Sequence, residues 1–124
     1  MASRFTIRLT ATRVLNTTRN VALADHAEFA RSPWSRFRGL MAQKAIEPGY
    51  GLVIEPCNSI HMFFMRFAID AVFLDKEGRV VYIADSIKPW RISRIVRKAK
   101  RVIEMPSGTC QRTGTKPGDL VAFN

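Results

Sequence analysis

The sequence predicts a mostly β fold, a small β-sandwich, jelly-roll-like or barrel domain, with one short amphipathic helix near residues 33–43. Short apolar runs rich in β-branched and aromatic residues recur along the chain. Turn-forming residues separate these runs, and one segment places its apolar residues at helical spacing. Many short strands between regular turn signals are typical of sandwiches and barrels.

The chain is expected to form a single domain over residues 1–124. A chain of 124 residues supplies one hydrophobic core, whereas two cores would each be undersized. No apolar run reaches about 18 residues, so no membrane-spanning helix is expected. The first eight residues alternate charged and apolar side chains without the apolar core of a signal peptide, which favours the cytoplasm.

The N-terminal third predicts two strands and then the helix. Alternating polar and apolar residues indicate a strand at 4–8, and a second short run at 21–24 follows the turn-like residues 16–20. Ser32-Pro33 then provides a cap followed by a proline suited to a first helical turn. Trp34, Phe37 and Met41 follow at spacings of three and four, which predicts an amphipathic helix packed on a sheet.

The remaining two thirds predict strands joined by turns. Residues 52–54 form a strand after a Pro-Gly turn, and 60–74, apolar at both parities, predict two buried strands or a single bent one. The polar residues 75–78 end in glycine between two β-rich runs, which predicts a hairpin. Two further strands are expected near 102–105 and 120–123.

Five segments, in this order, resemble the DUF192 family. The most specific has Met65, then Asp70 five positions later, then an apolar strand that ends in Asp-x-x-Gly. The resemblance runs from about residue 20 to the C-terminus and implies a compact, mostly β sandwich or jelly roll with a short helix after the first strands. It implies no activity and no catalytic residue. The family often has threonine and proline where this chain has Met62 and Ala68. The matching segments are residues 37–41, 51–56, 60–75, 89–91 and 103–108.

The net charge of +10 makes polyanions attractive partners. The cations concentrate in residues 88–101, a segment without a single acid that also contains a tryptophan. Cations that neutralise phosphates and an aromatic ring that stacks on a base are the ingredients of nucleic-acid binding. We therefore expect a noncatalytic module that binds a nucleic acid or an acidic protein, unless this segment is only a solvated face with its tryptophan in the core. The candidate residues are Trp90, Arg91, Arg94, Arg97, Lys98, Lys100 and Arg101.

The alternative is a small-ligand-binding protein or an enzyme with a pocket around His61, Met65, Arg66 and Asp70. Asp70 lies between apolar residues, so its carboxylate needs hydrogen-bond donors, a cation or solvent. It either fixes the backbone by accepting N–H bonds or acts as an acid or base in a cleft. Exposure separates the two hypotheses, because the first needs an exposed Trp90 and the second a concave pocket at Asp70.

Neither a metal nor a cofactor is predicted. Cys57, His61 and Met65 follow each other at intervals of four, but on a strand they would lie ~13 Å apart in succession, too far for one ion. No local signature joins Cys57 or Cys110 to His26 or His61, so no catalytic residue is assigned. Both cysteines are expected to be free thiols.

Overall fold

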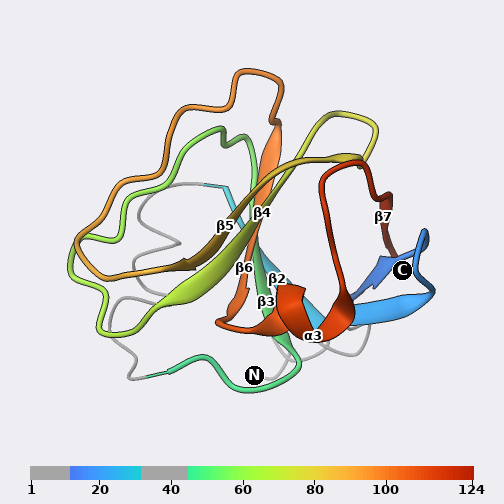
Figure 1. The fold of residues 1–124 in the computed structure, drawn as a ribbon, viewed down its shortest axis with the longest axis horizontal. Helices are drawn as coiled ribbons and strands as arrows, with labels where there is room; N and C mark the ends of the chain where they lie inside the picture. Colours follow the sequence, from blue (N-terminus) through green and yellow to red (C-terminus); the bar gives the residue numbers. More distant parts are fainter. Residues whose placement is uncertain (1–11, 32–44) are drawn as a thin grey trace, which may run out of the picture.

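A computed structural model describes residues 12–31 and 45–124, which form one curled sheet and a short helix (Figure 1). The sheet order is β5-β4-β6-β3-β2-β1-β7, and β2 and β3 run parallel while the other neighbouring pairs run antiparallel. A mostly β fold is therefore confirmed. The elements are β1 (Thr12–Asn16), β2 (Val21–Ala30), β3 (Tyr50–Ile54), β4 (Ile69–Leu74), β5 (Val80–Ile87), β6 (Arg101–Pro106), α3 (Thr109–Thr113) and β7 (Val121–Phe123).

The sheet curls until its two edge strands meet at one corner. The backbone N–H of Val80, at the start of β5, donates to the carbonyl of Asp119 at 2.8 Å, just before β7. The N–H of Val121 donates to the carbonyl of Gly78, also at 2.8 Å. These bonds occupy part of each open edge, which would otherwise be free to pair with another chain. The architecture is a half-barrel of seven strands in the described residues.

Both faces of β4 are buried, as the run of apolar residues at both parities predicts. All six of its residues are buried. Ala71 and Phe73 belong to the core on one face, which we call the first core, and Val72 and Leu74 belong to the second core on the other face. Each fully buried side chain of this size stabilises the fold by about 1.5–3 kcal/mol.

The hairpin at residues 75–78 is confirmed, because β4 and β5 pair antiparallel across it. The N–H of Gly78 donates to the carbonyl of Asp75 at 3.1 Å, and the carboxylate of Asp75 accepts the N–H groups of Glu77 and Arg79 at 2.9 Å each. The strands expected at 52–54, 102–105 and 120–123 are also confirmed, as β3, β6 and β7.

The structure differs from the sequence-based expectation in three places. Only the second half of the run 60–74 is a strand, because residues 60–68 form an irregular loop with one isolated bridge, His61 to Ile92. The strand at 21–24 extends to Ala30, and β1 and α3 were not predicted, because both are short and lack a clear apolar period. The strand expected at 4–8 and the helix expected at 33–43 lie outside the described residues.

Asp70 joins three elements from a fully buried position in β4. One carboxylate oxygen accepts the backbone N–H of Ser86, in β5, at 2.8 Å. The other accepts the N–H of Cys110, in α3, also at 2.8 Å. Of the two roles that the sequence allows for Asp70, these bonds match the first, in which the carboxylate accepts backbone N–H groups.

A second buried carboxylate, Asp119, ties the turn after β1 to the segment before β7. It accepts hydrogen bonds from Arg19 Nε at 2.7 Å, from Asn16 Nδ2 at 3.0 Å and from the N–H of Lys116 at 3.0 Å. Burial alone would raise the pKa of Asp119, but these hydrogen bonds and the charge of Arg19 outweigh it and hold the pKa below its ordinary value.

We expect Gly78→Ala to destabilise the protein more than Gly108→Ala does. Both glycines have positive φ, 89° and 97°, so each alanine costs about 1–2 kcal/mol of backbone strain. A Cβ on Gly78 would also lie 2.6 Å from the carbonyl oxygen of Val121, whereas one on Gly108 would meet nothing within 4 Å. The clash should add about 1–3 kcal/mol. Urea denaturation of both variants measures the difference, and equal losses would contradict the close approach of the hairpin to β7.

Asp70→Asn should lower the free energy of unfolding by about 1–3 kcal/mol, because an amide replaces a charged acceptor that faces two backbone donors. Asp85→Asn is the control, since Asp85 is an exposed neighbouring carboxylate and should change stability by less than about 0.5 kcal/mol. The measurement is again the midpoint of urea denaturation. An Asp70→Asn protein as stable as the parent would show that the two bonds do not hold the fold.

Candidate functional site

Two long loops lie side by side over the first core of the sheet (Figure 1). We call residues 56–66 the aromatic loop and residues 88–100 the basic loop. Backbone hydrogen bonds of 2.7–3.0 Å join them along their length, so the two loops form an irregular ribbon. The donor and acceptor pairs are Met62 to Arg91, Trp90 to Met62, Ser93 to Ile60, Val96 to Asn58 and Cys57 to Lys100.

The inward side chains of this ribbon fix its position. Ile60, Met62 and Met65 of the aromatic loop and Ala99 of the basic loop are buried in the first core. The hydroxyl of Ser93 accepts the N–H of Ile60 at 2.9 Å and donates to the carbonyl of Arg94 at 2.9 Å. With these residues buried, the side chains between them lie on the outer side of the ribbon.

Aromatic rings gather on the outer side of the ribbon. Phe64 and Trp90 are 63% and 59% exposed, and their ring centroids lie 5.0 Å apart at an interplanar angle of 60°. Phe63 lies 5.9 Å from Trp90 and stacks on His61 at 4.7 Å. We call these four residues the aromatic cluster. It presents ring surface to solvent, where a planar ligand can stack.

The backbone is strained at the two exposed rings. Phe64 has φ of 66° and Trp90 has φ of 67°, in the left-handed region that bulky residues rarely adopt. Each such residue costs about 1–3 kcal/mol of folding free energy. Because both rings are mostly exposed, packing of the rings offsets little of this cost. Strain of this kind concentrates at binding and active sites.

The cations of the basic loop are exposed along the loop that carries Trp90. The exposed members are Lys88, Arg91, Arg94, Arg97, Lys98 and Lys100. Arg94 also lies 5.2 Å from the centre of the Tyr82 ring. Two apolar side chains of the same loop, Ile92 and Ile95, are each 66% exposed.

Arg101 differs from the other candidate cations, because it belongs to β6. Its guanidinium lies 3.4 Å from the carboxylate of Glu55 and 5.2 Å from the centre of the Phe123 ring. These contacts tie Arg101 to the residue after β3 and to β7.

The four residues of the alternative pocket lie in different environments. Met65 is buried in the first core, and Asp70 is fully buried against two backbone N–H groups. Arg66 is exposed, and His61 belongs to the aromatic cluster. Among the described residues, no group of three or more His, Cys, Asp or Glu side chains could hold a metal ion. In the same part of the chain, no helix is long and apolar enough to cross a membrane.

Sequence reasoning missed that Phe64, Ile92 and Ile95 are exposed and that Phe63 is only half-buried. The two phenylalanines belong to an apolar run that suggests a buried strand, and isoleucine is usually buried. No sequence signal separates an exposed phenylalanine in such a run from a core one. The inward positions of Met62 and Met65 decide which of these rings face out.

The two cysteines are free thiols in different surroundings. Cys110 is buried beneath Asp70, and its burial together with the charge and hydrogen bond of that carboxylate raises its pKa to about 12. Cys57 is half-buried between the loops, and its thiol donates to the carbonyl of Ser59 at 3.1 Å.

We expect iodoacetamide to modify Cys57 in the native protein and to leave Cys110 unmodified. Alkylation requires an accessible thiolate, and Cys110 has neither access nor an ionised form near pH 8. Mass spectrometry of the digested protein measures both sites, and urea-unfolded protein, in which both should react, is the control. Modification of Cys110 at the rate of Cys57 in native protein would contradict the packing of α3 on Asp70.

Comparison with known proteins agrees with this fold. A UPF0127 protein of Pyrococcus horikoshii is 36% identical over 116 residues, which cover 89% of this chain and 97% of the relative. A UPF0127 protein of Pyrococcus furiosus is 34% identical over 117 residues, 90% of this chain and 97% of the relative. A crystal structure of a protein of unknown function from Novosphingobium aromaticivorans superposes with a TM-score of 0.76 at 24% identity, over 90% of this chain and 83% of that one.

The family model that matches this chain is DUF192, described as "Uncharacterized ACR", and the match extends over residues 14–123. This range includes both loops of the ribbon and all the described strands from Val14 onward. The chain belongs to the DUF192 family.

Proposed function

We propose that this protein is a noncatalytic module that binds single-stranded nucleic acid on the ribbon formed by the aromatic and basic loops. In this proposal the exposed cations neutralise backbone phosphates, and Trp90 and Phe64 stack on bases. The combination is the one that proteins use to hold single strands without reading their sequence.

One observation carries the proposal: two exposed aromatic side chains on strained backbone lie side by side, one in each loop, and the basic loop contains six cations and no acid. An exposed ring contributes little to folding, and a left-handed backbone at that ring opposes folding. A ligand that stacks on the rings accounts for the arrangement, since base–aromatic stacking contributes about 1–3 kcal/mol per base.

Charge favours a polyanion as the ligand. Each phosphate neutralised by an exposed cation releases a counterion, so several weak contacts sum to a useful affinity. The exposed Ile92 and Ile95 also suit an acidic protein or an anionic membrane, which are different classes of partner. A single strand is favoured over both because the cluster offers flat ring faces, which bases match better than aliphatic side chains or acyl chains do.

The test is fluorescence anisotropy with a labelled single-stranded RNA of about 12 nucleotides, within the usual site size of such modules, across a salt series. We expect binding that weakens steeply with salt, with a log–log slope of about −0.7 per neutralised phosphate. Trp90→Ala should weaken binding by about 1–3 kcal/mol with little change of slope, because stacking is lost and no cation is removed.

Arg91→Glu with Arg94→Glu should weaken binding and flatten the slope by about 1.4, the share of two phosphates. The matched control is Arg13→Glu with Arg112→Glu, which changes the net charge equally at exposed positions outside the ribbon. Equal losses in both double variants, or no binding at low salt, would overturn the proposal. Binding to an acidic peptide or to anionic vesicles without binding to RNA would assign the surface to that partner instead.

A further inference from the structure

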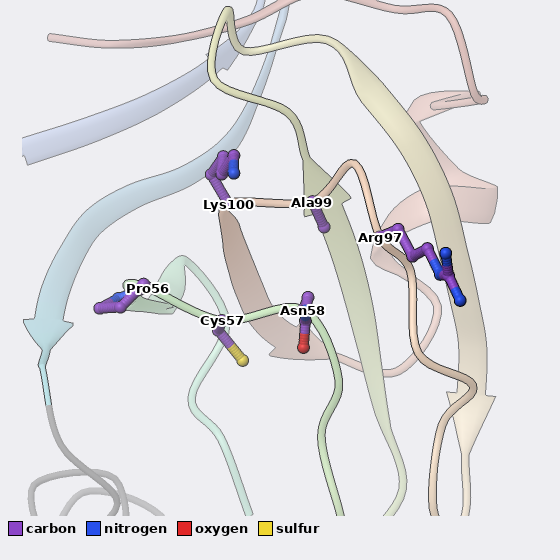
Figure 2. Close-up of a pocket in the computed structure, with 6 residues that line it drawn as sticks. All are labelled: Pro56, Cys57, Asn58, Arg97, Ala99 and Lys100. Atoms are coloured by element: carbon purple, nitrogen blue, oxygen red, sulfur yellow. The ribbon is translucent and has the colours of Figure 1, made fainter.

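A small pocket lies at the end of the ribbon away from the aromatic cluster. Its volume is about 240 Å³, and Figure 2 shows two short rows of residues that face each other across it. One row comes from the start of the aromatic loop and the other from the end of the basic loop, so the pocket exists only because the two loops pair. The lining residues are Pro56, Cys57, Asn58, Arg97, Ala99 and Lys100.

The pocket is cationic and offers hydrogen-bond donors. Figure 2 shows Arg97 and Lys100 on opposite sides of Ala99, with side chains that extend in different directions, and Asn58 in the neighbouring row. The nearby acid Glu55 is already paired with Arg101 at 3.4 Å, so it does not cancel the two lining cations. The lining residues supply a guanidinium, an ammonium and an amide, which are groups that proteins use to hold phosphate.

The length of the aromatic loop limits the distance between this pocket and the rings. Cys57 lines the pocket and Phe64 belongs to the aromatic cluster, seven residues further along the same loop. Seven residues span at most about 25 Å. A single strand of a few nucleotides therefore connects the two ends of the ribbon, with its bases on the rings and its backbone along the basic loop.

We infer that the pocket binds the terminal phosphate of a single-stranded nucleic acid, a deepening that rests on the proposed function. A phosphate monoester carries about −1.5 to −2 charges and three acceptor oxygens, whereas a phosphate inside the chain carries one negative charge. Two lining cations and an amide match the monoester better than the diester. Strands that carry a 5′- or a 3′-phosphate share this chemistry, and the experiment separates them.

Cys57 makes occupancy of the pocket measurable. Cys57 is half-buried and lines the pocket, so a ligand there should shield its thiol from iodoacetamide. Buried Cys110, whose pKa is raised to about 12, is the internal reference. The probes are one RNA sequence of about 12 nucleotides in 5′-phosphate, 3′-phosphate and unphosphorylated forms, and inorganic phosphate alone. At about ten times Kd, mass action predicts that the bound phosphorylated strand slows labelling of Cys57 about tenfold.

Affinity provides the second readout. One of the phosphorylated strands should bind about tenfold more tightly than the unphosphorylated strand, which corresponds to about 1.4 kcal/mol. Arg97→Gln with Lys100→Gln should abolish this preference and the protection of Cys57. Arg91→Gln with Arg94→Gln also removes two charges from the basic loop, but it should weaken all three strands alike and keep the preference.

The outcomes separate this inference from the function on which it rests. If all three strands bind equally and depend on Trp90, while Cys57 stays reactive, the nucleic-acid surface stands and the terminal-phosphate site is wrong. If no strand binds, both are wrong, even where inorganic phosphate protects Cys57. Protection by the 5′-phosphate strand and not by the 3′-phosphate strand, or the reverse, would support the inference and fix the direction in which the strand lies.

Discussion

The pairing of the aromatic and basic loops is the constraint on which the rest of the surface depends. Neither loop has a place in the sheet, and their backbone groups satisfy one another through the bonds that join them. Met62 and Met65 enter the first core, which leaves the two residues between them on the outside. The chain then turns at Phe64 in a left-handed conformation. The exposed ring is therefore a consequence of how the core is filled.

Two groups of cations among the described residues differ in their physics. Arg19 and Arg101 are held against carboxylates, at 2.7 Å and 3.4 Å, and connect parts of the fold. The exposed cations of the basic loop have solvent around them and repel one another, which opposes the compact state. Their field beyond the surface attracts anions over about 10 Å at moderate salt. The basic loop thus contributes six exposed positive charges to a chain whose net charge is +10.

The sheet is the scaffold of this protein, and the proposed ligand-binding residues lie on its loops. β3, β4 and β6 pair in the middle of the sheet and bury both of their faces, so their sequences are constrained by packing. Loops of 11 and 13 residues over one face have more freedom, and sites on a rigid scaffold are commonly built from such segments. Relatives with the same sheet and different side chains at Trp90, Arg97 or Lys100 would carry different binding properties on the same fold.

The sequence by itself determined the class of fold, the hairpin at residues 75–78, six of the described strands in whole or in part, and the basic character of the segment before β6. These features are local: turn chemistry, apolar runs and charge can each be read within about ten residues. It also set out two roles for Asp70, and only the tertiary structure showed that the N–H groups of Ser86 and Cys110 reach the carboxylate. Tertiary structure alone decided that Phe64 and Trp90 face outward, that Arg101 turns to Glu55 and that Cys57 meets Arg97 and Lys100. The physical reason is that the exposure and contacts of a side chain depend on which other segment packs beside it. In these pairs the two residues are separated by 26–46 residues of chain.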